Sequence, residues 1–373
     1  AYPTVSSIVC VDIIGGAHTL CISSDRTIYS FGSQRKGEHG QQETTVSIPK
    51  QIPNLQNIKT VHSTWDHSVC LTFNGEVYTF GDNSSGQLGI GETDFSYTHV
   101  PKLVSLPLVQ QISCGECFTV CLSDDGELYS FGRNQEGQLG LGNLANAYIP
   151  QKIESLRNVD FVECGGYFVI CKTFNGDIYA WGKNDMGQLG VGNMYHYRAP
   201  VKVPWPENII DIKCGLFHTL ALTSDQEVFS CGSDTQGQTA KLDNNCEFLT
   251  RIDGLSEITR IECGYNHSMC IDVYQNLFVF GNNIYGQLGL GDIDKRLTPV
   301  KHPILSNVID VSRGGFHSFV KTSNNEIFSM GYNKYSQLGA QTELTNQLTP
   351  LQVFQNKEDI WCSNITKQKQ NQQ

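Results

Sequence analysis

The chain alternates between short apolar runs and polar turns, without the apolar spacing of an amphipathic helix. The stretch from residue 200 to residue 232 shows the pattern most clearly. It holds four runs that favour β-structure, at residues 200–203, 209–215, 218–223 and 228–232. In several other copies the last two runs are joined by Asn-Gly or Asp-Gly, which is typical of tight hairpins. We therefore predict four short strands per unit.

A glycine that closes one strand of each unit recurs along the whole chain. Its copies are 49 to 51 residues apart, at Gly32, Gly81, Gly132, Gly182, Gly232, Gly281 and Gly331. The segment after it reads Asn-x-x-Gly-Gln-Leu-Gly at residues 83–89, 134–140, 184–190 and 283–289, with altered copies in the other repeats. Seven repeats of about 50 residues, each with four strands, predict an all-β fold, a seven-bladed β-propeller.

These motifs together resemble a known repeat. Each well-formed copy reads Cys-Gly-x-x-His-[Ser/Thr], then a hairpin, then Gly-x-Asn-x-x-Gly-Gln-Leu-Gly. This order resembles the regulator of chromosome condensation (RCC) repeat over about residues 8–362, with five near-complete copies. The resemblance implies a seven-bladed propeller, which agrees with the count of repeats.

The two ends of the chain compete for one place in the ring. Residues 359–362 match the first strand of a repeat, but residues 7–15 already supply a copy, so we expect one of them to be peripheral. We assign residues 1–366 to a single propeller and residues 367–373 to a polar tail that we expect to be disordered. The first residue is not Met, which favours a processed start or a piece of a longer protein.

Charge and composition narrow the class of partner. Lys and Arg number 26 against 37 Asp and Glu, a formal charge of -11, which argues against direct DNA binding. No apolar run is long enough for a membrane-spanning helix. Of the 14 cysteines, nine fall into two repeat registers, which indicates buried free thiols rather than a zinc site. Free thiols in this number favour the cytoplasm or the nucleus.

Histidine is the one ionisable residue type that recurs at a single repeat position. His18, His67, His218, His267 and His317 share it, and Phe118 and Phe168 replace it in two copies. Such repetition favours a structural role between neighbouring blades, because a catalytic site needs a singular constellation. The chain also lacks a phosphate-binding loop, a His-Glu-x-x-His metal motif and a nucleophile elbow. We expect no cofactor and no metal, and whether the protein is an enzyme stays open.

Residues that break the repeat are better candidates for binding a partner. The resemblance implies acidic and His contacts with a Ran-type GTPase in the loops before the His position, which suggests Asp66, Glu116 and His267, with Trp65 beside them. We expect Asp66 and Glu116 to form an exposed acidic patch on adjacent blades. A second off-pattern cluster contains Tyr195, Tyr197 and Arg198, residue types common at interfaces. A solvated loop charge or a packed loop between blades is the alternative at each place.

The sequence favours a monomeric protein-interaction propeller, with a small GTPase as a possible partner whose nucleotide release it could promote. Ran-type exchange in the nucleus is one alternative. The family's Ran exchange factor carries a β-wedge and a basic N-terminal tail, and the even repeat spacing leaves no room for the wedge. A recruitment domain of a larger protein, such as a HECT-type ubiquitin ligase, is the other alternative.

The net charge leads to a first prediction. We expect the chain to bind duplex DNA no more tightly than ordinary non-specific binding, on the order of micromolar at physiological salt, because its charge of -11 repels a polyanion. Fluorescence anisotropy of a labelled duplex, titrated at several salt concentrations, measures this. Tighter binding that weakens steeply with salt would reveal a basic face and contradict the prediction.

Overall fold

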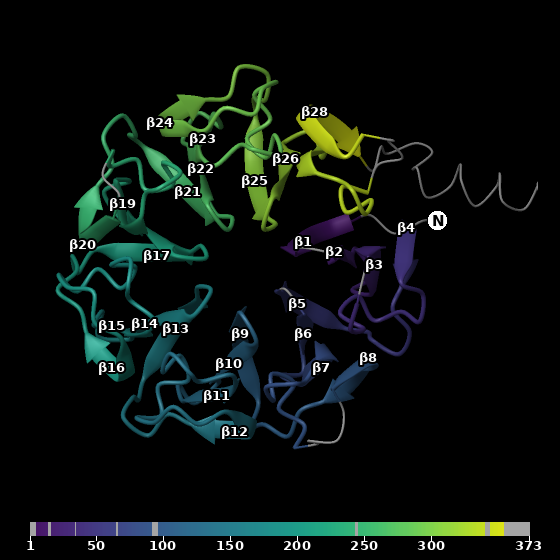
Figure 1. The fold of residues 1–373 in the computed structure, drawn as a ribbon, viewed down its shortest axis with the longest axis vertical. Helices are drawn as coiled ribbons and strands as arrows, with labels where there is room; N and C mark the ends of the chain where they lie inside the picture. Colours follow the sequence, from purple (N-terminus) through teal and green to yellow (C-terminus); the bar gives the residue numbers. More distant parts are fainter. Residues whose placement is uncertain are drawn as a thin grey trace, which may run out of the picture.

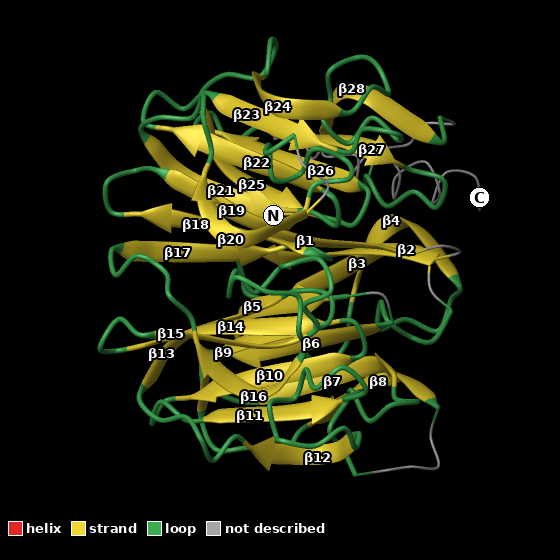
Figure 2. Ribbon diagram, turned by 60° about the vertical axis from the view of Figure 1, so that its left-hand side comes forward, coloured by secondary structure: helices red, strands yellow, loops and turns green. Residues whose placement is uncertain are grey.

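The fold is a closed ring of seven antiparallel sheets around a central channel (Figure 1). The computed structural model describes residues 5–13, 16–33, 35–64, 66–91, 96–242, 245–339 and 344–353. Each sheet has four strands, and the described strands all belong to one of these sheets. Figure 2 shows strands and loops only. The predicted all-β, seven-bladed propeller is confirmed.

The first four blades are built from sixteen consecutive strands. Blade 1 contains β1 (Val5–Ile13), β2 (Gly16–Ser23), β3 (Ile28–Ser33) and β4 (Thr45–Gln51). Blade 2 contains β5 (Ile58–Ser63), β6 (His67–Thr72), β7 (Val77–Asp82) and β8 (Tyr97–Leu103). Blade 3 contains β9 (Val109–Gly115), β10 (Phe118–Ser123), β11 (Leu128–Gly132) and β12 (Ala147–Lys152). Blade 4 contains β13 (Val159–Cys164), β14 (Phe168–Thr173), β15 (Ile178–Gly182) and β16 (Tyr197–Lys202).

The last three blades repeat this plan. Blade 5 contains β17 (Ile209–Cys214), β18 (His218–Thr223), β19 (Val228–Ser233) and β20 (Asn245–Arg251). Blade 6 contains β21 (Ile258–Cys263), β22 (His267–Asp272), β23 (Leu277–Gly281) and β24 (Arg296–Lys301). Blade 7 contains β25 (Val308–Arg313), β26 (His317–Thr322), β27 (Ile327–Tyr332) and β28 (Asn346–Val353). The strand runs predicted from the sequence coincide with these elements.

In every blade the chain runs from the channel outward. The first strand of each sheet lines the channel, and the fourth forms the outer edge (Figure 1). Blade 1 is complete with β1 as its first strand, so the N-terminal copy fills the place for which the two ends compete. Residues 359–362 and the predicted tail lie outside the described residues. Each blade is thus one uninterrupted segment of the chain.

The hairpin between the second and third strands has the same geometry around the ring. In blade 2, Thr72 N donates to Glu76 O at 3.0 Å and Gly75 N donates to Thr72 O at 3.1 Å. Gly75 takes a φ of 80°, which fits a type I turn followed by a left-handed residue. Other blades place a different residue at this position with a similar φ, namely Arg26, Gln226, Gln275 and Asn325. The predicted hairpin is confirmed, and it does not depend on glycine in every blade.

The Gly-Gln-Leu-Gly loops close on themselves through two buried amide side chains. In blade 3, Leu139 N donates to Asn134 Oδ1 at 3.0 Å, and Glu136 N donates to Gln138 Oε1 at 2.9 Å. Asn83, Asn184, Asn283 and Asn333 accept the equivalent bond in their blades. The repeated Asn and Gln are therefore structural, because they satisfy backbone N–H groups that the loop buries.

The core lies between the blades. The bulky residues that precede the anchor glycines are fully buried, among them Phe31, Phe80, Phe131, Trp181 and Phe280. The nine cysteines in the two repeat registers are all buried, as predicted. The twelve cysteines whose side chains the structure describes are free thiols, and burial raises the pKa of the Cys121 thiol well above its ordinary value. Neutral, buried Cys packs here as a small apolar residue.

The loop glycines generate a stability prediction. Gly137 has a φ of 78°, and a Cβ there would lie 2.7 Å from Arg198 Cα. Gly142 has the same φ, but a Cβ there would meet nothing within 4 Å. Both Gly137→Val and Gly142→Val place a β-branched residue in the left-handed region, but only Gly137→Val also forces a clash. We expect thermal unfolding to show the larger fall in Tm for Gly137→Val. Equal falls would contradict the packing argument.

Candidate interaction face

Two sets of loops emerge on the same side of the ring. One set lies between the first and second strands and carries the Gly-x-x-His motifs; the other contains the Gly-Gln-Leu-Gly segments. Backbone bonds join them, for example Arg133 N to Cys117 O at 2.8 Å and Lys183 N to Tyr167 O at 2.9 Å. We call this side the loop face. Because it collects the residues that differ between repeats, it is the candidate interaction site.

Backbone hydrogen bonds connect the loops of neighbouring blades at the mouth of the channel. In four consecutive blades, the residue after the motif glycine donates its backbone N–H to a carbonyl of the next blade. These bonds are Glu116 N to Gly166 O at 2.7 Å, Gly166 N to Gly215 O at 3.2 Å, Leu216 N to Tyr265 O at 3.0 Å and Tyr265 N to Gly315 O at 3.3 Å. Glycine allows this approach, since a Cβ on Gly115 would lie 2.2 Å from Gly165 O. The loops of blades 3 to 7 thus form one continuous surface.

The recurring histidines link each blade to the next. His67 Nε2 lies 2.9 Å from Thr119 Oγ1, and Thr119 donates its hydroxyl proton to Gln87 O at 3.1 Å. His67 Nε2 must therefore donate, so the proton of the neutral imidazole sits on this nitrogen. Burial lowers the pKa of His67 to about 4, in agreement with the neutral state. The structural role that the sequence favours for these residues fits this geometry.

His267 belongs to the same relay. Its Nε2 lies 3.0 Å from Ser318 Oγ, which donates to Gln287 O at 2.9 Å. The side chain is fully buried, and burial lowers its pKa to about 3. As placed, His267 has no exposed surface with which to contact a partner. This burial contradicts the partner contact that the resemblance implies for His267.

The relay also explains where the repeat pattern breaks. Phe118 replaces His in blade 3, and Val169 stands in the next blade where others carry Ser or Thr. Val169 cannot donate to Gln138 O, but the Trp181 indole Nε1 donates to it at 3.0 Å. Phe118 and Val169 thus form an apolar pair where other blades pair a His with a hydroxyl. Gln138 O still accepts a hydrogen bond, so no buried polar group is left without a partner here.

Asp66 lies on the loop face of blade 2 and is partly exposed. Its side chain is 20% exposed, and its Oδ2 is 3.7 Å from Lys36 Nζ in blade 1. Lys36 also contacts Asp82 Oδ2 at 2.9 Å. Partial burial raises the pKa of Asp66 above its ordinary value, and the nearby Lys36 charge offsets only part of this shift. Of the two predicted acidic residues, Asp66 is the one whose side chain reaches solvent.

Glu116 differs from its expected position. It lies on the adjacent blade, as predicted, but it is only 3% exposed and lines the channel. Burial raises its pKa well above the ordinary value, and the Tyr265 side chain opposes this shift. The expected exposed patch of Asp66 and Glu116 is therefore wrong, because Asp66 is only partly exposed and Glu116 is buried. The bond from Glu116 N to Gly166 O draws this loop inward. Trp65 lies outside the described residues.

Aromatic side chains on the loop face form a feature that sequence reasoning missed. Tyr167 stacks on Phe217 with ring centroids 6.2 Å apart, and the Arg133 and Lys183 side chains each lie 5.5 Å from the Tyr167 ring. A second group spans blades 6 and 7 through Tyr265–Phe316, Tyr285–Phe316, Tyr285–Tyr332 and Tyr332–Tyr335 contacts. These residues occupy variable loop positions, so the rule that selected Asp66 could have found them.

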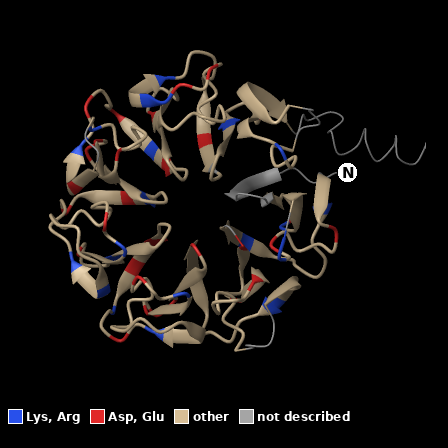
Figure 3. Ribbon diagram, in the orientation of Figure 1, with Lys and Arg blue, Asp and Glu red and all other residues tan. Residues whose placement is uncertain are grey.

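The second predicted cluster lies at the outer rim of blade 4. Tyr195 is 75% exposed, and Arg198 is also exposed. Tyr197 is half-buried, and its hydroxyl accepts a bond from Asn193 Nδ2 at 3.0 Å. Asp66 lies in blade 2, so the structure does not place these predicted contacts in one site (Figure 1). Charges of both signs are spread around the ring (Figure 3).

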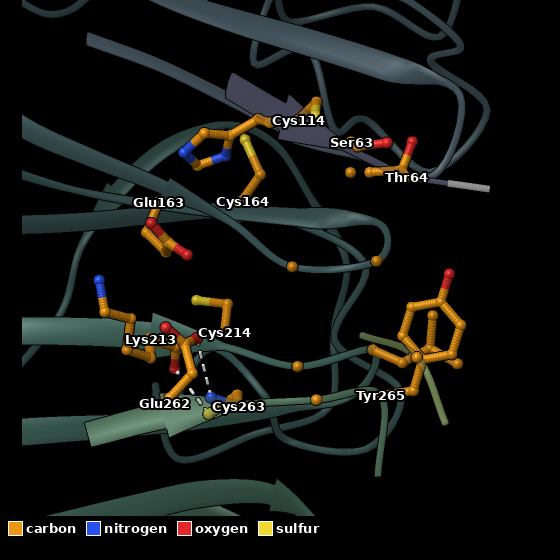
Figure 4. A pocket seen from close by; sticks show the side chains of 18 of the residues that line it. Ser63, Thr64, Cys114, Glu163, Cys164, Lys213, Cys214, Glu262, Cys263 and Tyr265 are labelled. Carbon is orange, nitrogen blue, oxygen red and sulfur yellow. Dashed lines mark hydrogen bonds between the residues drawn. The ribbon is translucent and has the colours of Figure 1, made fainter. Parts of the chain in front are cut away.

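The channel contains a cavity of about 230 Å³ (Figure 4). Glu163, Lys213 and Glu262 reach it from three neighbouring blades. Cys114, Cys164, Cys214 and Cys263 also line it. Among the described residues, no group of three or more His, Cys, Asp or Glu could hold a metal ion. The described part of the chain also contains no helix with the length and apolar character needed to cross a membrane.

Comparison with known proteins agrees with this architecture. The family model of the RCC1-like domain matches residues 3–206 and 162–369. The chain belongs to this family. The Arabidopsis thaliana ultraviolet-B receptor UVR8 is 30% identical over 347 residues, which cover 91% of this chain and 68% of that protein. The resemblance inferred from the repeats is confirmed.

Other members of the RCC1-like family match over shorter stretches. The dog X-linked retinitis pigmentosa GTPase regulator is 31% identical over 144 residues, and the human E3 ubiquitin-protein ligase HERC2 is 30% identical over 148 residues. These alignments span 37% and 38% of this chain but only 14% and 3% of the two relatives. They relate this RCC1-like propeller to part of each larger protein.

Solved structures share the fold. Human WBSCR16 superimposes with a TM-score of 0.79 at 21% identity, over 88% of this chain and 95% of that chain. Prp20p from Saccharomyces cerevisiae superimposes with a TM-score of 0.73 at 22% identity, over 83% and 80%. At such identities the likeness concerns the RCC1-like architecture alone.

An altered Gly-Gln-Leu-Gly copy in blade 1 generates a pH prediction. Glu38 stands where the other repeats carry Gln, is fully buried and accepts N–H bonds from Arg35 at 2.8 Å and Lys36 at 2.7 Å. Burial raises its pKa from 4.5 to about 7. Because the folded pKa exceeds the unfolded one, the free energy of unfolding should fall as pH rises from about 4.5 to about 7.

Glu38→Gln should remove this pH dependence, since Gln keeps the bond that the other copies make. Urea unfolding between pH 5 and pH 8 should show a gain in stability that grows with pH. Glu43→Gln in the same repeat is the control, because a hydrogen bond from Lys50 lowers the pKa of Glu43. Its effect should not grow in the stabilising direction. A Glu38→Gln effect that is constant across pH would refute the assignment.

Proposed function

We propose that this RCC1-like propeller is a protein-interaction module that binds one protein partner through the loop face. The observation that supports this is that the repeated side chains are buried in the ring, whereas the side chains that vary between blades reach the surface of the loop face. The repeated His, Asn and Gln residues are buried and hydrogen-bonded within the ring. The half-exposed loop positions instead carry residues that differ from blade to blade, such as Asp66, Tyr167 and Phe217. A single partner meets a seven-fold ring asymmetrically, so these variable residues suit recognition.

A small GTPase is the class of partner that the comparisons favour for this role. One relative is named a GTPase regulator, and the solved structure of Prp20p is described together with its binding properties to Gsp1p and histones. Promotion of nucleotide release needs no catalytic group, because an exchange factor acts by binding the nucleotide-poor GTPase more tightly than the loaded one. The partly exposed Asp66 would meet a basic residue of the GTPase, in competition with Lys36. We place this activity, carried out by a monomer, in the cytoplasm or the nucleus.

Two alternatives remain distinct from this proposal. Ran-type exchange in the nucleus is weakened because every strand in the described residues belongs to a blade, which leaves no additional hairpin there. A recruitment domain within a larger protein is favoured by the match to HERC2, although that match spans only 3% of the ligase. In that case the same loop face would bind a substrate protein.

Charge reversal at Asp66 tests the face. In a panel of purified small GTPases loaded with a fluorescent nucleotide, the chain should accelerate nucleotide release from at least one member. Asp66→Lys should lower that acceleration by about 30-fold, the equivalent of about 2 kcal/mol at a hot spot. Glu116 is left unchanged, because a lysine in its buried site would disturb folding.

Asp160→Lys provides the matched control, since Asp160 is exposed at the opposite end of a channel-lining strand. It should leave nucleotide release unchanged. If no GTPase responds, the exchange activity is disproved and the recruitment alternative becomes the working proposal. If Asp66→Lys has no effect on a responding GTPase while the protein stays folded, the Asp66 region is not the contact. The cluster of Tyr195, Tyr197 and Arg198 is then the next surface to test.

A further inference from the structure

The larger aromatic group of the loop face forms a continuous row of rings across blades 6 and 7. Successive ring centroids are 5.6, 5.1, 4.9 and 6.1 Å apart, in the order Tyr265, Phe316, Tyr285, Tyr332 and Tyr335. All five side chains are half-buried. The row begins where Tyr265 lines the channel cavity (Figure 4) and ends in the altered Gly-Gln-Leu-Gly loop of blade 7. We call it the aromatic row.

The backbone holds these rings in place. Tyr285 N donates to Gln287 Oε1 at 3.0 Å, and Tyr335 N donates to Gln337 Oε1 at the same distance. Tyr332 is the last residue of β27, so its backbone belongs to the sheet of blade 7. Rings that are fixed before binding lose little conformational entropy when a partner docks on them.

The segments that carry the aromatic row are nearly uncharged. No Asp or Glu and a single Lys occur in residues 264–267, 282–286, 314–317 and 331–336. The Lys is Lys334, which is exposed and has its Nζ 5.5 Å from the centroid of the Tyr335 ring. The row therefore offers a neutral aromatic surface with one positive charge at its outer end.

The smaller aromatic pair on the loop face differs from the row because the chain covers it with its own cations. Lys183 Nζ lies 5.5 Å from the Tyr167 ring and 5.1 Å from the Phe217 ring. Among the described residues, no Lys or Arg side chain lies over Tyr285, in the middle of the row. The same residues give its hydroxyl no hydrogen-bond partner. The centre of the row thus leaves both a ring and a donor for an outside group.

This chemistry fits a proline-rich segment better than a cationic one. A cation can bind an aromatic face, but here it would meet the charge of Lys334 and find no carboxylate in the segments of the row. Proline rings are uncharged, and a polyproline II segment leaves its backbone carbonyls unpaired, so Tyr hydroxyls can donate to them. Lys334 favours an acidic residue at one end of such a segment.

We propose that the aromatic row binds a proline-rich segment of a partner protein in the polyproline II conformation, with an acidic residue of the segment beside Lys334. Ile284, which is 55% exposed, extends the apolar contact next to Tyr285. The site lies in blades 6 and 7, whereas Asp66 precedes β6 in blade 2 (Figure 1). It goes beyond the proposed function, because it requires neither Asp66 nor a GTPase.

Two displayed peptide libraries test the site on the whole chain. One library fixes Pro at every third position, the repeat of a polyproline II helix, and the other fixes Gly there; all other positions are random. We expect enrichment from the Pro library, and the enriched peptides are synthesised with a fluorescent label. Anisotropy titrations should show a Kd that rises at least about tenfold in Tyr285→Ala, since a central ring is lost. Tyr285→Phe loses the hydroxyl alone and should raise the Kd about fivefold.

A second tyrosine provides the matched control. Tyr274 is 68% exposed, but it lies in the hairpin after β22, at the end of blade 6 opposite the loop face. Tyr274→Ala should leave the Kd unchanged. Lys334→Glu should raise the Kd of peptides that end in an acidic residue, and this effect should shrink as salt is added. The Tm of each variant checks that it is folded.

The proposal is overturned if the Pro library yields no more binders than the Gly library, or if Tyr285→Ala and Tyr274→Ala weaken binding equally. It is also overturned if the enriched peptides depend on Arg or Lys and keep their Kd when their prolines are replaced by Ala, since the row then takes a cation. A Kd that Lys334→Glu does not change would overturn the acidic residue assigned beside Lys334. Peptide binding is measured without a GTPase, so its failure is distinct from a failure of nucleotide release.

Discussion

The ring depends on the hydroxyl that follows the His position at the start of the second strand, which six of the seven blades carry. In those six it donates to the carbonyl of the matching loop in the preceding blade, as Thr119 does to Gln87 O. The hydroxyls of Ser68, Thr119, Ser268 and Ser318 also meet an imidazole of that blade. These polar groups are buried, so each needs its partner. The two signature motifs of the repeat are thus the two halves of one bond network, which explains why they recur together.

Much of the fold could be predicted because it is set locally and repeated. The strand at residues 218–223 and the hairpin at Gly75 follow from alternation and turn chemistry within a few residues. The substitution of Trp181 as donor to Gln138 could not be predicted, since the two residues lie 43 positions apart and meet only after the blades pack. The sequence predicts where the strands fall within each repeat. It does not predict which residue of one blade replaces a missing hydrogen-bond donor of another.

The candidate site shows the same limit. Asp66 and Glu116 hold nearly equivalent places in consecutive repeats, yet one is partly exposed and the other is buried. The loop at Glu116 bonds to the next blade through Glu116 N and Gly166 O, whereas blade 2 carries Thr64 in place of the motif glycine. A repeat position therefore predicts which face a residue approaches, but the neighbouring blade decides whether its side chain reaches solvent.

Because every blade is one uninterrupted segment, blades 7 and 1 meet at a seam that shares no sheet. Thr19 Oγ1 donates to Gln337 O at 2.7 Å across it, and Phe31 packs with Phe319 in a small cluster. Opening this seam would break lateral contacts alone and leave all seven sheets whole. A pulling force on the two ends of the chain would thus meet its weakest joint there, and the ring would uncoil into an arc of intact blades before any blade lost a strand.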